Sequence, residues 1–189
     1  MSEEAEVDYG PLTGLIGKWS GDKGLDIAPE VEGQEESEYY ETLEFSPIGL
    51  VTNVDSQDLA GLFYRQVVQD KSDDEFIHNQ TGYLLWDAQA KTVINSFTIP
   101  RGLCTLAAGS YNGETDENGR TVLTFKASHD DPNWTIIQSP FMSKTAKSLS
   151  FDMKLVFGDG FLRYEQMTLI DIFGRNFEHT EHNELTPDN

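Results

Sequence analysis

Hydrophobic and polar side chains alternate with a period of two along most of the chain. In residues 39–45 the odd positions (Tyr39, Glu41, Leu43, Phe45) share one face and the even positions share the other. Such alternation is typical of a half-buried strand. Further strand-like segments follow, separated by turn-forming residues: 62–68, 76–86, 92–99, 103–111, 121–127, 134–138 and 148–157.

The chain ends in a predicted hairpin over residues 160–185, whose turn lies at Ile172-Phe173-Gly174-Arg175. Lys18-Trp19-Ser20 begins the first strand, and Pro11 opens a short helical turn over residues 11–16 that can plug one barrel end. Residues 22–37, rich in glycine and acidic side chains, are predicted to form a loop at one rim. About ten short strands without a long helix indicate an all-β fold, an antiparallel barrel or a sandwich.

Length and pattern favour one domain, with residues 1–10 as an acidic tail and residues 11–189 as the β-domain. A closed barrel of about ten strands has room for a ligand, whereas a filled core without a ligand is the alternative. The sequence leaves open whether the protein is a monomer or a homodimer.

The charge excludes some partners. Thirty-three acidic against 13 basic residues give a formal net charge of −20, which repels nucleic-acid phosphates and anionic lipid. There is no apolar run of the roughly 18 residues that a membrane-spanning helix needs, so we expect no membrane partner. The single cysteine allows no internal disulfide, which favours a cytoplasmic protein.

Two histidines are candidates for a ligand site. His179 shares a strand face with Phe177 and Leu185, so the closing strand can aim its imidazole into the barrel; the alternative is a surface histidine. His182, three residues on, points to the opposite face, which argues against a His179–His182 metal pair. His78 is either a ligand contact or a hydrogen-bonded barrel histidine. Asp22, Asp26 and Glu30 offer oxygen donors, but their spacing is not that of a calcium loop.

Short motifs along nearly the whole chain resemble those of the nitrobindins and related haem-binding β-barrel domains, which have a lipocalin-like and fatty-acid-binding-protein-like shape. The motifs are Gly17-x-Trp19-x-Gly21, Tyr39-x-Glu41-x-Leu43-x-Phe45-Ser46, Tyr64-x-Gln66, His78-x-x-x-Gly82-Tyr83, Gly109-Ser110-Tyr111-Asn112, and Met167-Thr168 ahead of His179. The resemblance implies a single up-and-down antiparallel barrel of about ten strands.

The resemblance also implies a haem b pocket, with His179 as the axial metal ligand and His78, Trp19 and Gly21 as further cofactor-binding candidates. Trp19 has packing as its alternative role. Family members are credited with binding nitric oxide and isomerising peroxynitrite, which makes a peroxynitrite isomerase the enzyme hypothesis; no catalytic residue is assigned. Glu181 shares the face of His179 and is an unusual neighbour for an apolar haem edge.

Two other functions stay open. One is a carrier of a fatty acid or another small hydrophobic ligand, although the Arg-x-Tyr pattern of fatty-acid-binding proteins is absent and only Arg65, Arg101 or Arg163 could serve alone. The other is an interaction barrel without a ligand, whose contact surface would be the acidic segment 22–37.

Overall fold

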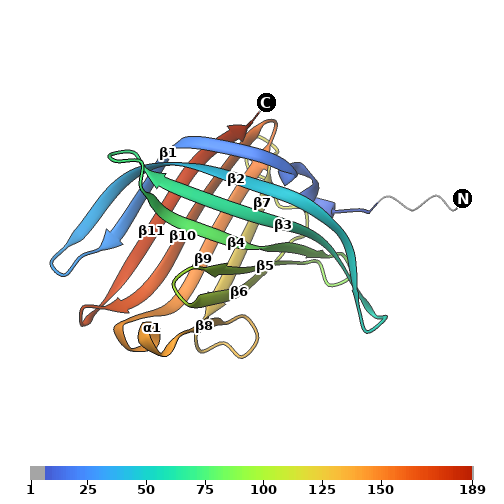
Figure 1. Cartoon of the computed structure of the whole chain (residues 1–189). Coiled ribbons are helices and arrows are strands. Elements are labelled where there is room, and N and C mark those ends of the chain that lie inside the picture. Colours follow the sequence, from blue (N-terminus) through green and yellow to red (C-terminus); the bar gives the residue numbers. More distant parts are fainter. Residues whose placement is uncertain (1–6, 189) are drawn as a thin grey trace, which may run out of the picture.

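The computed structural model describes residues 7–188, which form one closed sheet with two short helices (Figure 1). Within this range the elements are the 3-10 helix η1 (Gly10–Leu15), the α-helix α1 (Pro140–Thr145) and eleven strands: β1 (Gly17–Pro29), β2 (Gln34–Asn53), β3 (Gln57–Asp70), β4 (Phe76–Asp87), β5 (Thr92–Ile99), β6 (Leu103–Ser110), β7 (Thr121–Ser128), β8 (Ile136–Gln138), β9 (Ala146–Gly158), β10 (Phe161–Ile172) and β11 (Arg175–Pro187). None of the described helices is long and apolar enough to cross a membrane.

Ten of these strands form an antiparallel up-and-down barrel, and β8 pairs only with β6 at its edge. Consecutive strands are neighbours, β5 pairs with β6, and β11 closes the ring on β1. The predicted fold class is therefore confirmed, including the last hairpin, where Ile172 pairs with Arg175 across the turn. Phe173 (φ 54°) and Gly174 (φ 76°) supply the positive φ angles that a tight hairpin turn requires.

The prediction of a rim loop over residues 22–37 is wrong. Strand β1 continues to Pro29 and β2 begins at Gln34, so most of the segment is a hairpin with a turn at residues 30–33. The register shifts between Gly21 and Gly24, which marks a bulge. At Gly24 a Cβ atom would lie 2.2 Å from the ring of Tyr39, so the absent side chain makes room for that aromatic ring.

Two smaller elements differ from the sequence-based expectation. The strand predicted over residues 134–138 is only the three-residue β8, and α1 was not expected. Helix α1 begins where Ser139 accepts a hydrogen bond from the Met142 backbone N–H (3.3 Å) and Pro140 occupies the first turn.

Helix η1 plugs one end of the barrel, as its sequence predicts. Leu12 and Leu15 are fully buried in the core, and the Trp19 indole N–H donates to the Leu15 carbonyl (2.8 Å). The acidic tail was predicted over residues 1–10; residues 1–6 lie outside the described part of the chain. Val7 and Tyr9 pack against the core, and the Tyr9 hydroxyl accepts a hydrogen bond from the Gly49 N–H (3.0 Å).

Candidate functional site

A cavity of about 370 Å³ lies within the barrel, at the end away from η1. It is lined by the ends of strands and by α1; on β4 it reaches Ile77 and His78, whereas Gly10 of η1 abuts Trp86 at the other end of that strand. The volume falls in the lower part of the range for small-molecule sites. The predicted alternative of a completely filled core therefore does not describe this end of the barrel.

The two sides of the cavity differ in chemistry. Apolar side chains come mainly from β5, β6, β8 and β9: Phe97, Ile99, Leu103, Ile136 and Phe151. Three ionisable side chains gather on β1 and β11, namely Asp26, His179 and Glu181, while Glu35, His78 and Arg101 line the cavity from β2, β4 and the turn between β5 and β6. In the ten-strand ring, the β1–β11 seam is opposite the β5–β6 seam, so the ionisable groups on β1 and β11 face the apolar groups across the cavity.

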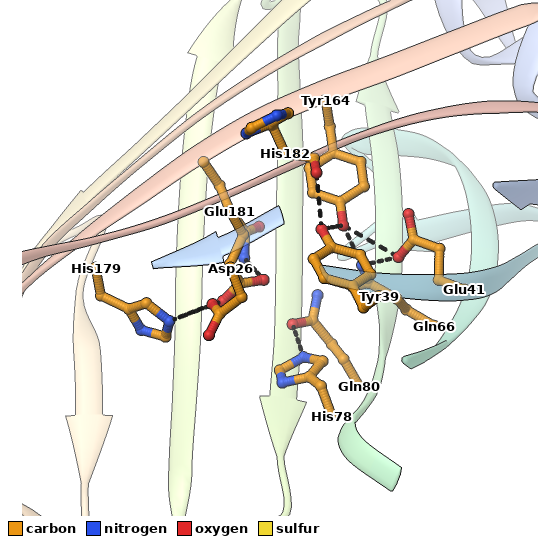
Figure 2. A network of polar contacts seen from close by, with 11 residues as sticks. Asp26, Tyr39, Glu41, Gln66, His78, Gln80, Tyr164, His179, Glu181 and His182 are labelled. Atoms are coloured by element: carbon orange, nitrogen blue, oxygen red, sulfur yellow. Dashed lines mark hydrogen bonds and ion pairs between the residues drawn. The ribbon is translucent and has the colours of Figure 1, made fainter. Parts of the chain in front are cut away.

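His179, Asp26 and Glu181 form a compact cluster on the β1–β11 seam (Figure 2). The His179 Nε2 lies 2.6 Å from Asp26 Oδ1 and 3.6 Å from Glu181 Oε1. The Gln166 side-chain amide donates to Glu181 Oε2 (2.8 Å). The side chains of His179, Asp26 and Glu181 are 23%, 18% and 15% exposed, so the cluster is largely removed from bulk water.

The charge of His179 depends on opposing effects. Burial lowers the pKa of its imidazole and the Arg101 charge lowers it further, but the hydrogen bond to Asp26 and the negative charges of Glu181 and Asp26 outweigh both. The net effect raises the pKa of His179 above its ordinary value of 6.5. The imidazole thus holds its proton more strongly than a free histidine.

His78 also lines the cavity, from β4. Its Nε2 donates to the Gln80 side-chain carbonyl (3.2 Å), and the Gln80 amide donates to the Tyr64 hydroxyl (2.6 Å). The Tyr64 hydroxyl in turn donates to Asn95 Oδ1 (3.0 Å). His78 therefore lines the cavity and is also the hydrogen-bonded barrel histidine that was its alternative prediction.

Next to the cavity, on the same inward face of β2 as Tyr39, lies a buried carboxyl group, Glu41, with three side-chain donors (Figure 2). Its Oε2 accepts from Gln66 (2.7 Å) and from the Tyr164 hydroxyl (3.1 Å), and its Oε1 accepts from the Asn183 amide (3.1 Å). The Tyr39 hydroxyl lies 2.6 Å from that of Tyr164 and connects this network to the cavity, because Tyr39 is a lining residue.

Burial raises the pKa of Glu41 to about 7, although the hydrogen bonds from Gln66, Tyr164 and Asn183 oppose the rise. The nearby charge of Glu181 raises it further. Glu41 therefore changes protonation near neutral pH, a behaviour that is common at functional sites and also occurs in structural networks.

The predicted site residues separate into two groups. His179 and His78 both line the cavity, whereas Trp19 and Gly21 are not among its lining residues. Trp19 packs in the core, and a Cβ atom at Gly21 would lie 2.4 Å from the Glu184 carbonyl oxygen, so Gly21 serves the close approach of β1 to β11. His182 is exposed on the outer face of β11, as the strand alternation predicts.

Asp26 and Glu41 were not expected at the site. Asp26 was assigned to the rim loop, and only its pairing with β11 places it in the cavity. The sequence does single out Glu41, because it is a charged residue on the same strand face as Tyr39, Leu43 and Phe45. A carboxylate on an apolar strand face indicates either a buried network or a binding group.

The comparisons with known proteins agree with this architecture. The model of the THAP4-like, heme-binding beta-barrel domain family matches residues 8–186. The chain belongs to this family. The crystal structure of Rv2717c from M. tuberculosis superposes with a TM-score of 0.72 at 18% sequence identity, covering 97% of this chain and 100% of that chain, which shows a shared fold. No curated protein matches the chain.

The family's description raises the question of whether these residues fit a haem. An axial histidine needs a ring nitrogen whose lone pair is free for iron. The Nε2 of His179 is hydrogen-bonded to Asp26 (2.6 Å) and Glu181 Oε1 lies 3.6 Å from it, so two carboxylate oxygens already crowd the nitrogen that an iron would have to bind. The Nδ1 atom adjoins the carbon that carries Cβ, so a macrocycle there would meet the strand. The residues in this arrangement therefore do not fit a haem iron.

Proposed function

We propose that this THAP4-like barrel binds a small amphiphilic ligand, with its apolar part against β5, β6, β8 and β9 and its polar head between Arg101 and His179. The observation that carries the proposal is the cavity itself, in which a mostly apolar surface on β5, β6, β8 and β9 meets a few ionisable groups, Arg101 and the Asp26–His179–Glu181 cluster among them. Binding sites for small molecules are usually largely apolar, with a few placed polar groups that fix orientation.

The polar head that fits best is an anion such as a carboxylate. Among Arg65, Arg101 and Arg163, only Arg101 lines the cavity, and its charge reaches His179. Arg65 is exposed on the outer face of β3, and Arg163 is exposed and paired with Glu165. Arg101 is therefore the cationic group that the cavity offers to such a head, because the Nε2 of His179 already lies between the Asp26 and Glu181 carboxylates.

Displacement of a fluorescent fatty-acid probe tests this proposal. The wild-type protein should bind the probe saturably at one site, and Arg101→Ala should weaken binding about tenfold through the loss of a charge-assisted contact. Arg163→Ala removes an equivalent charge from the outer surface and should leave the affinity unchanged. Equal losses in the two variants, or no saturable binding, would contradict the proposal.

Haem b is the second candidate ligand, because the family is described as heme-binding and His179 lines the cavity from the closing strand. It requires the Asp26 carboxylate to release the His179 ring. A hemin titration followed by the Soret band tests it: a sharp band that is lost in His179→Ala and kept in His182→Ala supports haem. Asp26→Asn should then strengthen hemin binding, because the ring nitrogen is held less firmly. A reaction with nitric oxide or peroxynitrite requires bound haem, so the absence of that band would exclude it.

A further inference from the structure

The Asp26–His179–Glu181 cluster contains an electrostatic imbalance. Asp26 and Glu181 are direct cross-strand partners between β1 and β11, and both side chains point into the barrel. Like charges directly opposite each other on one sheet face repel, and they do so more strongly where water is largely excluded. A protonated His179 contributes one positive charge against these two carboxylates, so the three side chains together keep a negative charge that a bound cation would balance; Arg101 acts on His179 from outside the cluster.

The donor atoms are close enough to share one ion. One donor atom from each of the three side chains lies within 4.8 Å of the others. Ligand atoms around a tetrahedral zinc ion lie about 3.4 Å apart, given bonds of about 2.1 Å. The Nε2–Oε1 separation from His179 to Glu181, 3.6 Å, already matches this value, and the Nε2–Oδ1 separation to Asp26, 2.6 Å, needs to widen by less than about 1 Å.

Two features outside the cluster support a binding role. The Gln166 amide donates a hydrogen bond to Glu181 Oε2, which orients the carboxylate so that Oε1 faces His179. Metal ligands in proteins are commonly oriented by such a hydrogen bond from a neighbouring side chain. The cluster also borders the cavity, so coordination positions not taken by protein would face an incoming ligand. Three protein ligands with an open fourth position is the pattern of zinc sites that act on or hold small molecules.

We propose that Asp26, His179 and Glu181 bind one divalent first-row transition-metal ion of the zinc class within the barrel. One imidazole nitrogen and two carboxylates suit such an ion. A bare ion also fits between the carboxylates, where a porphyrin does not. The ion would take the place of the Nε2 proton, which is released to solvent on binding. This inference deepens the proposed function, because the open coordination positions and Arg101 would together hold an anionic head.

Titration of the full chain, after chelator treatment, with Co²⁺ and Zn²⁺ tests the proposal. Excess Mg²⁺ and salt suppress loose binding to the acidic surface. We expect one equivalent of Co²⁺ to bind, with the visible absorption of a low-coordinate site, and Zn²⁺ to displace it. Asp26→Asn and His179→Ala should each weaken binding at least tenfold, and Gln166→Ala by roughly ten- to a hundredfold. His182→Ala, on the outer face of the same strand, is the matched control and should bind as the wild type does.

Several results would overturn the proposal: no stoichiometric binding by the wild type, an equal loss in His182→Ala, or no loss in Asp26→Asn. If His179→Ala fails to fold, as judged by circular dichroism, Asp26→Asn still decides the question. Asp26→Asn also distinguishes binding of a bare metal ion from binding of haem, since it should weaken the affinity for the ion and strengthen the affinity for hemin. If the protein binds the fatty-acid probe but takes up no metal, only the metal-site inference is contradicted. If it takes up metal but does not bind the probe, only the proposal of an amphiphilic ligand is contradicted.

Discussion

At the scale of single residues, the barrel interior holds ionisable groups whose protonation is set by their neighbours. His179 is paired with a carboxylate, and Glu41 is surrounded by neutral donors. The first arrangement favours the charged form of its histidine, and in the second the cost of burial favours the neutral form of its carboxyl group.

The first prediction concerns His179 in metal-free protein. Its imidazole should titrate above pH 6.5, and Asp26→Asn should lower that pKa, because the substitution removes both the accepting carboxylate and a negative charge. NMR titration of the His179 ring signals in the wild type and in Asp26→Asn measures both values. A pKa of His179 that does not move in Asp26→Asn would contradict the assigned cause.

The second prediction concerns Glu41. Because its folded-state pKa is raised to about 7, its contribution to stability is present at low pH and is lost as pH rises from its ordinary value of 4.5 through 7. A difference of this size corresponds to about 3 kcal/mol. Urea unfolding at pH 5 and pH 8 should show a larger loss in the wild type than in Glu41→Gln, where only the loss that comes from the raised pKa of His179 remains. Glu44→Gln, on the outer face of β2, is the control and should keep the wild-type pH dependence.

At the scale of elements, the two ends of the barrel have different tasks. Helix η1 fills one end with Leu12 and Leu15, and the cavity occupies the other. Stability and binding should therefore be separable by substitution.

Leu15→Ala should reduce the free energy of unfolding by about 2–5 kcal/mol, since it leaves a hole in a packed core. Ile16→Ala removes a similar aliphatic side chain that is 39% exposed, and should change stability by about 0.5 kcal/mol or less. Neither substitution should alter the affinity for the fatty-acid probe, because neither Leu15 nor Ile16 lines the cavity. Urea unfolding and probe titration on the same samples check both statements.

The same elements show what a sequence can predict. Alternation predicted the strands, the closing hairpin and the inward direction of His179, because strand geometry alone decides which residues share a face. The prediction of a loop over residues 22–37 is wrong because its acidic side chains and glycines are typical of a loop. Its strand structure comes from the pairing of β1 with β2 and with β11, and β11 lies far along the chain. With that pairing unknown, Asp26 could not be placed beside His179, and the cluster was visible only in the folded barrel.

At the scale of the whole molecule, the dominant feature is a formal net charge of −20. The 13 basic residues can neutralise at most 13 of the 33 acidic side chains, and the ion pairs that form are mostly exposed, so each contributes little. Mutual repulsion among surface carboxylates opposes the compact state.

This repulsion makes stability depend on salt. The Debye length falls from about 10 Å at 0.1 M to about 3 Å at 1 M, so added NaCl should raise the free energy of unfolding measured in urea. A triple variant, Glu32→Lys with Asp73→Lys and Glu117→Lys, changes three exposed sites and takes the formal net charge from −20 to −14. Its stability should be higher at low salt and should respond less to NaCl. If both proteins gain equally from salt, the effect comes from ion binding or solvent exclusion rather than from screening, and the repulsion argument fails.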